Sequence, residues 1–243
     1  MSRKPIIVIA AAHDIGVENH FEQYALSKTY ALAVAAGGAI PVLAVAETIP
    51  EAYAAQCDGL VLTGGWPVHA DVIASGYISR EEQTAYTRHA RDPYDISLFH
   101  AFRQLEKPVL GICRGHQYIN IAQNGDLNYD IAASYQREHR DGYYHMVKAD
   151  KDSVLGRLYG EEFLVNSYHN YHIQTLGDDL RITAWSPDGL PEALEHVSLP
   201  IFGVQWHPER MRGEQKNPPK GPDMTSLFEY LTECCVTIRD KRL

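Results

Sequence analysis

The chain has 243 residues, enough for one large domain or two small ones, and its 45% hydrophobic and 22% charged residues are typical of a folded globular protein rather than a disordered or fibrous one. With 22 Lys and Arg against 31 Asp and Glu, its formal net charge is −9 at pH 7. Because such an acidic surface repels phosphate backbones and anionic lipid headgroups, neither nucleic acid nor membrane is an expected partner.

The four cysteines are too few and too irregularly spaced for a disulfide framework or for a zinc site made of two CxxC pairs. Free thiols in a reducing compartment, and hence a cytoplasmic protein, are the better expectation. The apolar run Ile6–Ala12 is as short as the apolar region of a signal peptide can be, so we interpret it as a first strand. Glycine and proline interrupt the uncharged run Tyr30–Ala46, which argues against a membrane span.

Apolar runs of strand length alternate with helical patterns in the first half of the chain. The predicted strands are Ile6–Ala11, Pro41–Val45, Gly59–Leu62 and Val109–Ile112, and the predicted helices are Gln23–Ala36 and Asp95–Leu105. Gly37-Gly38 ends the first helix, as a left-handed glycine does, and Lys107-Pro108 ends the second. This alternation indicates βαβ units around a mostly parallel sheet.

Shorter segments between turn signals follow in the second half, where we predict antiparallel or edge strands. These strands are Phe163–Val165, Arg181–Trp185 and Glu192–Glu195. A closing helix is expected over Asp223–Ile238, with Asp223 as its N-cap. The expected architecture is an α/β fold in one domain over residues 1–243.

The sequence GICRG at 111–115 carries the first sign of chemistry. It follows a strongly apolar strand and precedes a helical pattern at Gln117–Ala122, so Cys113 is expected on a tight strand-to-helix turn, the geometry of a nucleophile elbow. The N-terminus of this helix would lie beneath the Cys113 sulfur, and the positive end of the helix dipole favours the thiolate. The alternative is that Cys113 is a small buried hydrophobic residue, as most free cysteines are.

A thiolate that carries out acyl transfer needs a histidine to move the proton and, in most cases, an acid to orient that histidine. The sequence QWHPE at 205–209 supplies both, as His207 and Glu209 at the end of a predicted strand. The alternation of side chains along an extended chain aims the two the same way. Taken alone, a histidine two residues before a glutamate is more often a surface pair.

Three motifs, GICRGHQ at 111–117, VNSYH at 165–169 and GVQWHPE at 203–209, together resemble the class I glutamine amidotransferase-like superfamily. More narrowly, the chain resembles the γ-glutamyl-γ-aminobutyrate hydrolase (peptidase C26) branch, with support from AGGAIP at 36–41 and from the pair Arg91-Asp92. The similarity covers nearly the whole chain. It implies a flavodoxin-like three-layer sandwich with a central, mostly parallel sheet.

The resemblance also implies roles for individual residues. Cys113 is the expected nucleophile, His207 its base and then acid, and Glu209 the carboxylate that orients the imidazole. The implied oxyanion hole consists of the backbone N–H groups of Gly65 and Arg114, and the implied substrate-binding residues are Gly64, Gln117, Ser167 and His169. Two plainer explanations stay open: glycines at 64–65 are also what a turn after a strand requires, and Gln117 is equally well explained as a surface helix residue.

The chain departs from the family's pattern beside the expected pocket. Asn170-Tyr171 stands where the branch usually has a second histidine and a glutamine, and Pro67 stands where it usually has an aspartate. These differences leave the core chemistry intact and leave the amine half of the substrate open.

The expected activity is hydrolysis of a small γ-glutamyl amide to glutamate and an amine, through a γ-glutamyl thioester and without a cofactor. We expect no synthase domain fused to this chain, so a glutaminase subunit that passes ammonia to a partner synthase is the second choice. An inactive binding protein is the third, because Cys113, His207 and Glu209 are all present. The sequence leaves open whether the protein forms a homodimer. The twelve histidines, among them His169 and His172, show no recognisable pattern with acidic or cysteine ligands, so no metal is expected.

Overall fold

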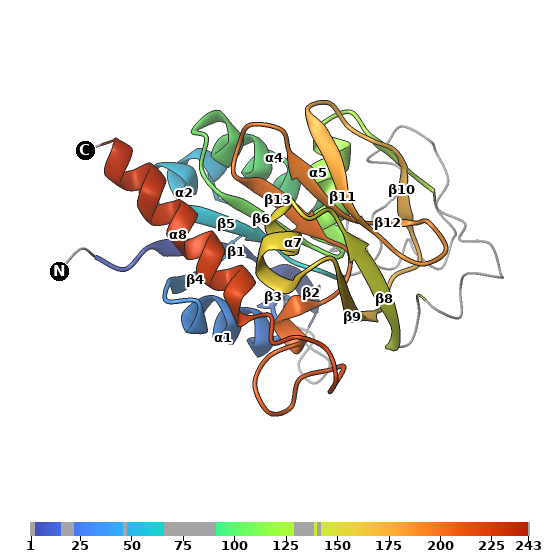
Figure 1. Ribbon diagram of the computed structural model, residues 1–243. Helices are drawn as coiled ribbons and strands as arrows, with labels where there is room; N and C mark the ends of the chain where they lie inside the picture. The colour runs from blue at the N-terminus through green and yellow to red at the C-terminus, as the bar shows by residue number, and fades with distance from the viewer. Residues whose placement is uncertain are drawn as a thin grey trace.

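The computed structural model describes residues 3–15, 22–45, 48–65, 91–128, 139 and 142–242, and over these ranges it shows a nine-stranded mixed sheet with helices on both faces (Figure 1). Across the sheet the strands are β4 (Ile40–Ala44), β1 (Ile6–Ala10), β5 (Gly59–Leu62), β6 (Val109–Ile112), β13 (Ile201–Val204), β12 (Pro191–His196), β11 (Leu180–Trp185), β8 (Tyr143–Ala149) and β9 (Glu162–Ser167). The predicted α/β sandwich is confirmed.

The sheet has two halves. Strands β4, β1, β5, β6 and β13 run parallel to one another, and we call them the parallel half. Strands β12, β11, β8 and β9 pair in antiparallel fashion and form the antiparallel half, as the turn-rich second half of the sequence predicts. Two separate two-stranded sheets join β7 (Asp126–Asn128) to β10 (His172–Thr175) and β2 (Ala12–Ile15) to β3 (Glu22–Ala25).

Helices cover the two faces of the sheet in two separate groups. One face carries α2 (Pro50–Gln56), α4 (Arg91–Gln104) and α5 (Arg114–Ala122), and the other carries α1 (Lys28–Ala36), α7 (Val154–Tyr159) and α8 (Thr225–Lys241). Side chains of β1 alternate between them: Ile7 and Ile9 pack in the core beneath α1 and α8, and Val8 packs in the core beneath α4 and α5. Each face of the sheet therefore has its own hydrophobic core.

The first helix is shorter than the sequence predicts. The expected helix Gln23–Ala36 is wrong in its first turn, because Glu22–Ala25 forms β3 and pairs with β2 instead. Helix α1 starts at Lys28, after Ser27, whose hydroxyl accepts the backbone N–H of Thr29. Its end is as expected, since Gly38 has a φ of +94°.

Two other helix starts also differ from the expectation. Helix α4 begins at Arg91 rather than at Asp95, so the pair Arg91-Asp92 opens it. Helix α8 has Met224 as its N-cap rather than Asp223. The carboxylate of Asp223 still accepts the backbone N–H of Thr225 at 2.9 Å, so it stabilises the same helix end from one residue further out.

No helix in the described ranges combines the length and apolarity that crossing a membrane requires. Pro67, one of the departures from the family's pattern, lies outside the described residues.

Candidate active site

Cys113 lies between the end of β6 and the start of α5, on the strand-to-helix turn that the sequence predicts. Its φ of +54° falls in the left-handed region, which costs free energy for a residue with a side chain. The flanking glycines make room for the turn: a Cβ on Gly115 would lie 2.1 Å from the carbonyl oxygen of Leu62, and one on Gly111 would lie 2.5 Å from that of Gly115. Only glycine at both positions lets α5 approach β5 and β6 so closely.

His207 and Glu209 follow β13, the strand that pairs with β6, and Glu209 sits in the short helix η3 (Pro208–Arg210). Glu209 Oε1 lies 2.8 Å from His207 Nδ1, and both residues are buried. Asn166 of β9 holds the backbone of His207 from both sides: its Oδ1 accepts the His207 N–H at 2.9 Å and its Nδ2 donates to the His207 carbonyl at 3.1 Å. The pair is thus buried and fixed, and the surface alternative is wrong for these two residues.

Cys113 and His207 both lie close to Gly64. A Cβ built on Gly64 would lie 2.7 Å from His207 Cε1 and 3.4 Å from the Cβ of Cys113. Glycine at 64 therefore keeps open the space between the thiol and the imidazole, and the plain turn explanation is not its whole role.

Charge around His207 favours the imidazolium. Burial alone would lower the pKa of His207, but the charges of Glu209 and Cys113, with hydrogen bonds to both, raise it to about 10. At neutral pH the imidazole therefore keeps its proton between a carboxylate on one side and the sulfur on the other.

Tyr30 of α1 is a site residue that the sequence does not reveal, because it fits the ordinary apolar face of a helix. Its hydroxyl accepts the backbone N–H of Gly64 at 3.0 Å and lies 3.5 Å from His207 Nδ1. Burial, followed by the charges of Glu209 and Cys113, raises the pKa of Tyr30 well above its usual value, so the phenol stays neutral.

The two expected oxyanion-hole residues, Arg114 and Gly65, have different surroundings. The side chain of Arg114 forms a buried ion pair with Asp95 at 2.5 Å and donates to the Tyr118 hydroxyl at 2.8 Å. Its backbone N–H lies in the first turn of α5, where N–H groups point out of the helix end. Gly65 follows Gly64 after β5 and is exposed.

Gln117 is buried, so the surface alternative for this residue is wrong. Its Nε2 lies 3.2 Å from the carbonyl oxygen of Tyr171 and 3.1 Å from Oε1 of Gln205. Gln117 therefore ties α5 to the segment after β9 and to the end of β13.

Ser167 and His169 both contact His139, which the sequence does not single out. Ser167 Oγ and the backbone N–H of His169 donate to the carbonyl of His139, at 3.0 and 2.7 Å. The ring of His169 also belongs to a buried group with His139, His145 and Glu192 that has the composition of a metal site. No short spacing in the sequence links these residues, and the fold brings them together. The expectation that the protein binds no metal stays a prediction.

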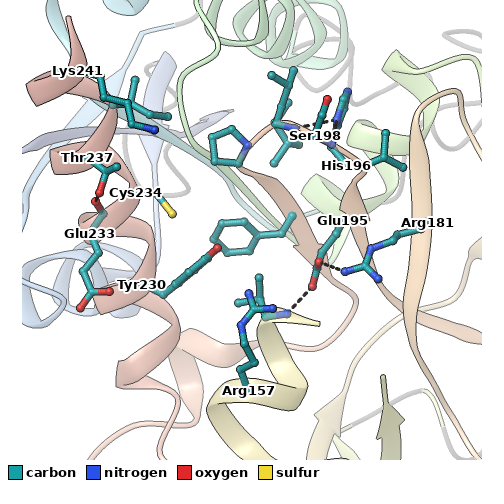
Figure 2. Close-up of a pocket in the computed structure, with 17 residues that line it drawn as sticks. Arg157, Arg181, Glu195, His196, Ser198, Tyr230, Glu233, Cys234, Thr237 and Lys241 are labelled. Carbon is teal, nitrogen blue, oxygen red and sulfur yellow. Dashed lines mark hydrogen bonds and ion pairs between the residues drawn. The ribbon is translucent and has the colours of Figure 1, made fainter. Parts of the chain in front are cut away.

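A separate hollow of about 580 Å³ lies away from Cys113. Figure 2 shows the side chains that line it. The hollow is lined by α7, α8 and the start of β13, with Arg157, Glu195 and Tyr230 around it. Since β6 and β13 are parallel and Cys113 follows the end of β6, this hollow lies at the opposite edge of the sheet. It takes no part in the candidate active site.

Comparison with known proteins gives a consistent family assignment. The family model of peptidase C26 matches residues 5–209. The glutamine amidotransferase-like protein YvdE of Lactococcus lactis is 36% identical over 65% of this chain and 68% of its own length. The γ-glutamyl-γ-aminobutyrate hydrolase PuuD of Escherichia coli is 29% identical over 76% of this chain and 78% of its own. A GMP synthase-like protein of Thermoplasma acidophilum shares the fold, with a TM-score of 0.69, 18% identity and coverage of 100% and 99% of the two chains.

Proposed function

Because the chain belongs to the peptidase C26 family, we propose that it hydrolyses the γ-glutamyl amide bond of a small γ-glutamyl compound, giving glutamate and an amine. One observation carries the proposal: Cys113 stands on a strained elbow beside His207, which Glu209 holds at 2.8 Å. The similarity to a γ-glutamyl-γ-aminobutyrate hydrolase supports the substrate class.

In the first step the Cys113 thiolate attacks the γ-carbonyl carbon of the substrate. The imidazolium of His207, whose pKa is about 10, holds the proton that the thiol has given up. Negative charge develops on the carbonyl oxygen, where the backbone N–H groups of Gly65 and Arg114 would donate hydrogen bonds to it. The carbon–nitrogen bond then breaks, His207 protonates the departing amine, and a γ-glutamyl thioester remains on Cys113.

In the second step a water molecule attacks the thioester carbon. His207, now neutral, takes a proton from that water, and the carbon–sulfur bond breaks to release glutamate and the Cys113 thiolate. Glu209 orients the ring in both steps, because its carboxylate bonds His207 Nδ1, the ring nitrogen that faces away from Cys113.

We further propose that Gly64, Gln117, Ser167 and His169 form the wall that receives the glutamyl group. Gly64 supplies close backbone approach, since its missing Cβ leaves space beside His207 and Cys113. The polar groups of Ser167 and His169 bond to His139, so these two residues would act by fixing the position of their segment.

The test is a glutamate-release assay of the purified chain with γ-glutamyl amides of differing amine size and charge, with glutamine included. We expect release without any partner protein, loss of release in Cys113→Ser, and full release in the matched variant Cys234→Ser, whose thiol is half-buried on α8. No release from any γ-glutamyl amide would overturn the proposed activity.

A second candidate is a glutaminase subunit that delivers ammonia to a partner synthase. The similarity to glutamine amidotransferase-like proteins favours it. The same assay separates the two, because a subunit of this kind would accept glutamine in preference to larger amides and would be nearly inactive alone.

A further inference from the structure

Four buried side chains converge between the antiparallel half of the sheet and the segment after β9, in a group that we call the histidine cluster. Its members are His139, His145 of β8, His169 after β9 and Glu192 of β12. One nitrogen or carboxylate oxygen from each lies within 4.8 Å of all the others. The four residues are between 0% and 6% exposed, so bulk water does not solvate these polar groups.

The spacing within the histidine cluster fits a metal ion. Glu192 Oε1 lies 3.5 Å from His139 Nδ1, 3.5 Å from His145 Nε2 and 3.4 Å from His169 Nε2. His139 Nδ1 and His169 Nε2 are 3.0 Å apart. Tetrahedral zinc lies about 2.0–2.1 Å from its nitrogen and oxygen ligands, which places those ligands about 3.4 Å from one another. Four of the six distances in the cluster are 3.0–3.5 Å and none exceeds 4.8 Å, so small movements of the side chains would give these dimensions.

The outer nitrogen of each imidazole has an acceptor of its own. These bonds join His139 Nε2 to Asp188 Oδ2 at 2.9 Å, His145 Nδ1 to the Met146 carbonyl at 3.1 Å, and His169 Nδ1 to the Tyr171 carbonyl at 2.9 Å. Because a carboxylate or carbonyl oxygen only accepts, the outer nitrogens donate, and a neutral ring then turns the lone pair of its inner nitrogen toward the cluster centre. Metal-bound histidines are oriented in this way.

Without a metal ion, hydrogen bonds leave several polar atoms of the histidine cluster without a partner among the described residues. Lone pairs on His139 and His169 would face each other at 3.0 Å, and among the described residues His145 Nε2 and both Glu192 oxygens have no hydrogen-bond partner. An extra proton on His139 or His169 would bond the other ring at 3.0 Å. It would reach Glu192 only over 3.4–3.5 Å, which is long beside the roughly 2.7–2.9 Å of a charge-assisted bond, and it would leave His145 Nε2 without a partner. One cation at the centre would satisfy all four groups at once.

We propose that the histidine cluster binds one divalent transition-metal ion, with Zn²⁺ as the best match. Three imidazole nitrogens and one carboxylate oxygen suit zinc, whereas Mg²⁺ and Ca²⁺ prefer oxygen ligands. The carboxylates of Glu192 and Asp188 supply two negative charges close to the centre, which a divalent ion balances.

The proposed site is structural, because protein atoms fill four positions and the residues are buried. Its ligands join β8, β12 and the segment after β9. His169 Nδ1 and Gln117 Nε2 donate to the same carbonyl, that of Tyr171. The metal would therefore fix the segment after β9 against α5, beside the proposed glutamyl-binding wall.

Metal content of the full chain, produced without a histidine tag, tests the site. After loading with Zn²⁺ and removal of excess metal, we expect about one equivalent per chain by plasma mass spectrometry. His145→Ala and Glu192→Gln should lower the affinity for zinc by about 100-fold or more, whereas His172→Ala, which removes a histidine just outside the cluster, should keep full stoichiometry.

A cobalt spectrum makes the test independent of whether the variants fold. Co²⁺ in the cluster should give the intense visible bands of a tetrahedral ion without a thiolate charge-transfer band, and Cys113→Ser should leave the spectrum unchanged. Less than about one-tenth of an equivalent after loading, a thiolate band that disappears in Cys113→Ser, or full zinc binding by Glu192→Gln would each overturn the proposal. The readout is metal binding, so it stands whether or not the proposed hydrolase activity does.

Discussion

Among the residues that the structure describes, buried histidine and glutamate side chains meet at two sites, and their neighbours make the two sites different. At the carboxyl edge of the parallel half, His207 lies between one carboxylate, Glu209, and one thiol, Cys113. At the antiparallel half, Glu192 faces three imidazole nitrogens at 3.4–3.5 Å. A single imidazole between two acidic groups holds and moves a proton, whereas several converging lone pairs favour a bound cation.

The largest expected effect is a loss of activity from a change at Cys113 that leaves the histidine cluster intact. Cys113→Ala should lower kcat for a γ-glutamyl amide by at least about 10⁴-fold, because no other group near His207 can form the thioester. The variant should keep its circular dichroism and its metal content. Substantial turnover by this variant would show that Cys113 is not the nucleophile.

The second prediction separates the proton carrier from the group that orients it. His207→Ala should cost about 10⁴-fold in kcat, and Glu209→Gln should cost at least about tenfold less, because the amide can still hold the ring without its charge. Both variants are compared on one γ-glutamyl amide after equal folding is established. Equal losses would remove the distinction between the two roles.

The third prediction concerns pH. The rate constant kcat/KM should fall on the alkaline side with an apparent pKa of about 10, because His207 must carry the proton that the amine receives. Glu209 raises this pKa, so Glu209→Gln should move the alkaline fall to lower pH.

The same raised pKa has a consequence for stability. Its contribution to the free energy of unfolding is complete below the pKa of an unfolded histidine and is lost as the pH rises toward about 10. The stability difference between wild type and Glu209→Gln should therefore shrink over that range. An alkaline fall in kcat/KM at the same pH in both proteins would contradict the assigned role of the Glu209 charge.

The smallest expected effect comes from Tyr30. Tyr30→Phe removes the hydroxyl that accepts the Gly64 N–H at 3.0 Å, a loss of about 1 kcal/mol, or about fivefold in kcat/KM. Tyr53→Phe is the matched control. The Tyr53 hydroxyl also accepts a backbone N–H, that of Val45 at 3.2 Å, and this bond lies far from the candidate active site. We expect similar losses of stability and a loss of kcat/KM only in Tyr30→Phe. If the two variants had equal kcat/KM, the Tyr30 hydroxyl would have no role in the active site.

The two sites also differ in how far the sequence reveals them. Cys113, His207 and Glu209 stand in two short motifs, each directly after a buried strand, and the pairing of β6 with β13 brings the motifs together. Parallel strands carry the residues after them to a common edge, so the location of this site follows from the strand pattern.

The histidine cluster has no such local pattern. His139, His145, His169 and Glu192 come from four segments that the tertiary structure brings together. Strand pairing places β8, β9 and β12 in one sheet, and bonds from Ser167 and His169 to the His139 carbonyl hold His139 beside them. Tyr30 is hidden for a different reason, because a tyrosine on the apolar face of a helix has the same spacing as any core residue. In both cases the tertiary structure, rather than any spacing in the chain, creates the contact.

The most direct test of the catalytic mechanism is mass spectrometry of the enzyme quenched during turnover of a γ-glutamyl amide. We expect a γ-glutamyl adduct on the peptide that contains Cys113, with none on Cys57, Cys234 or Cys235. Turnover with the adduct on another residue, or with no adduct while Cys113→Ala stays active, would contradict the proposed mechanism.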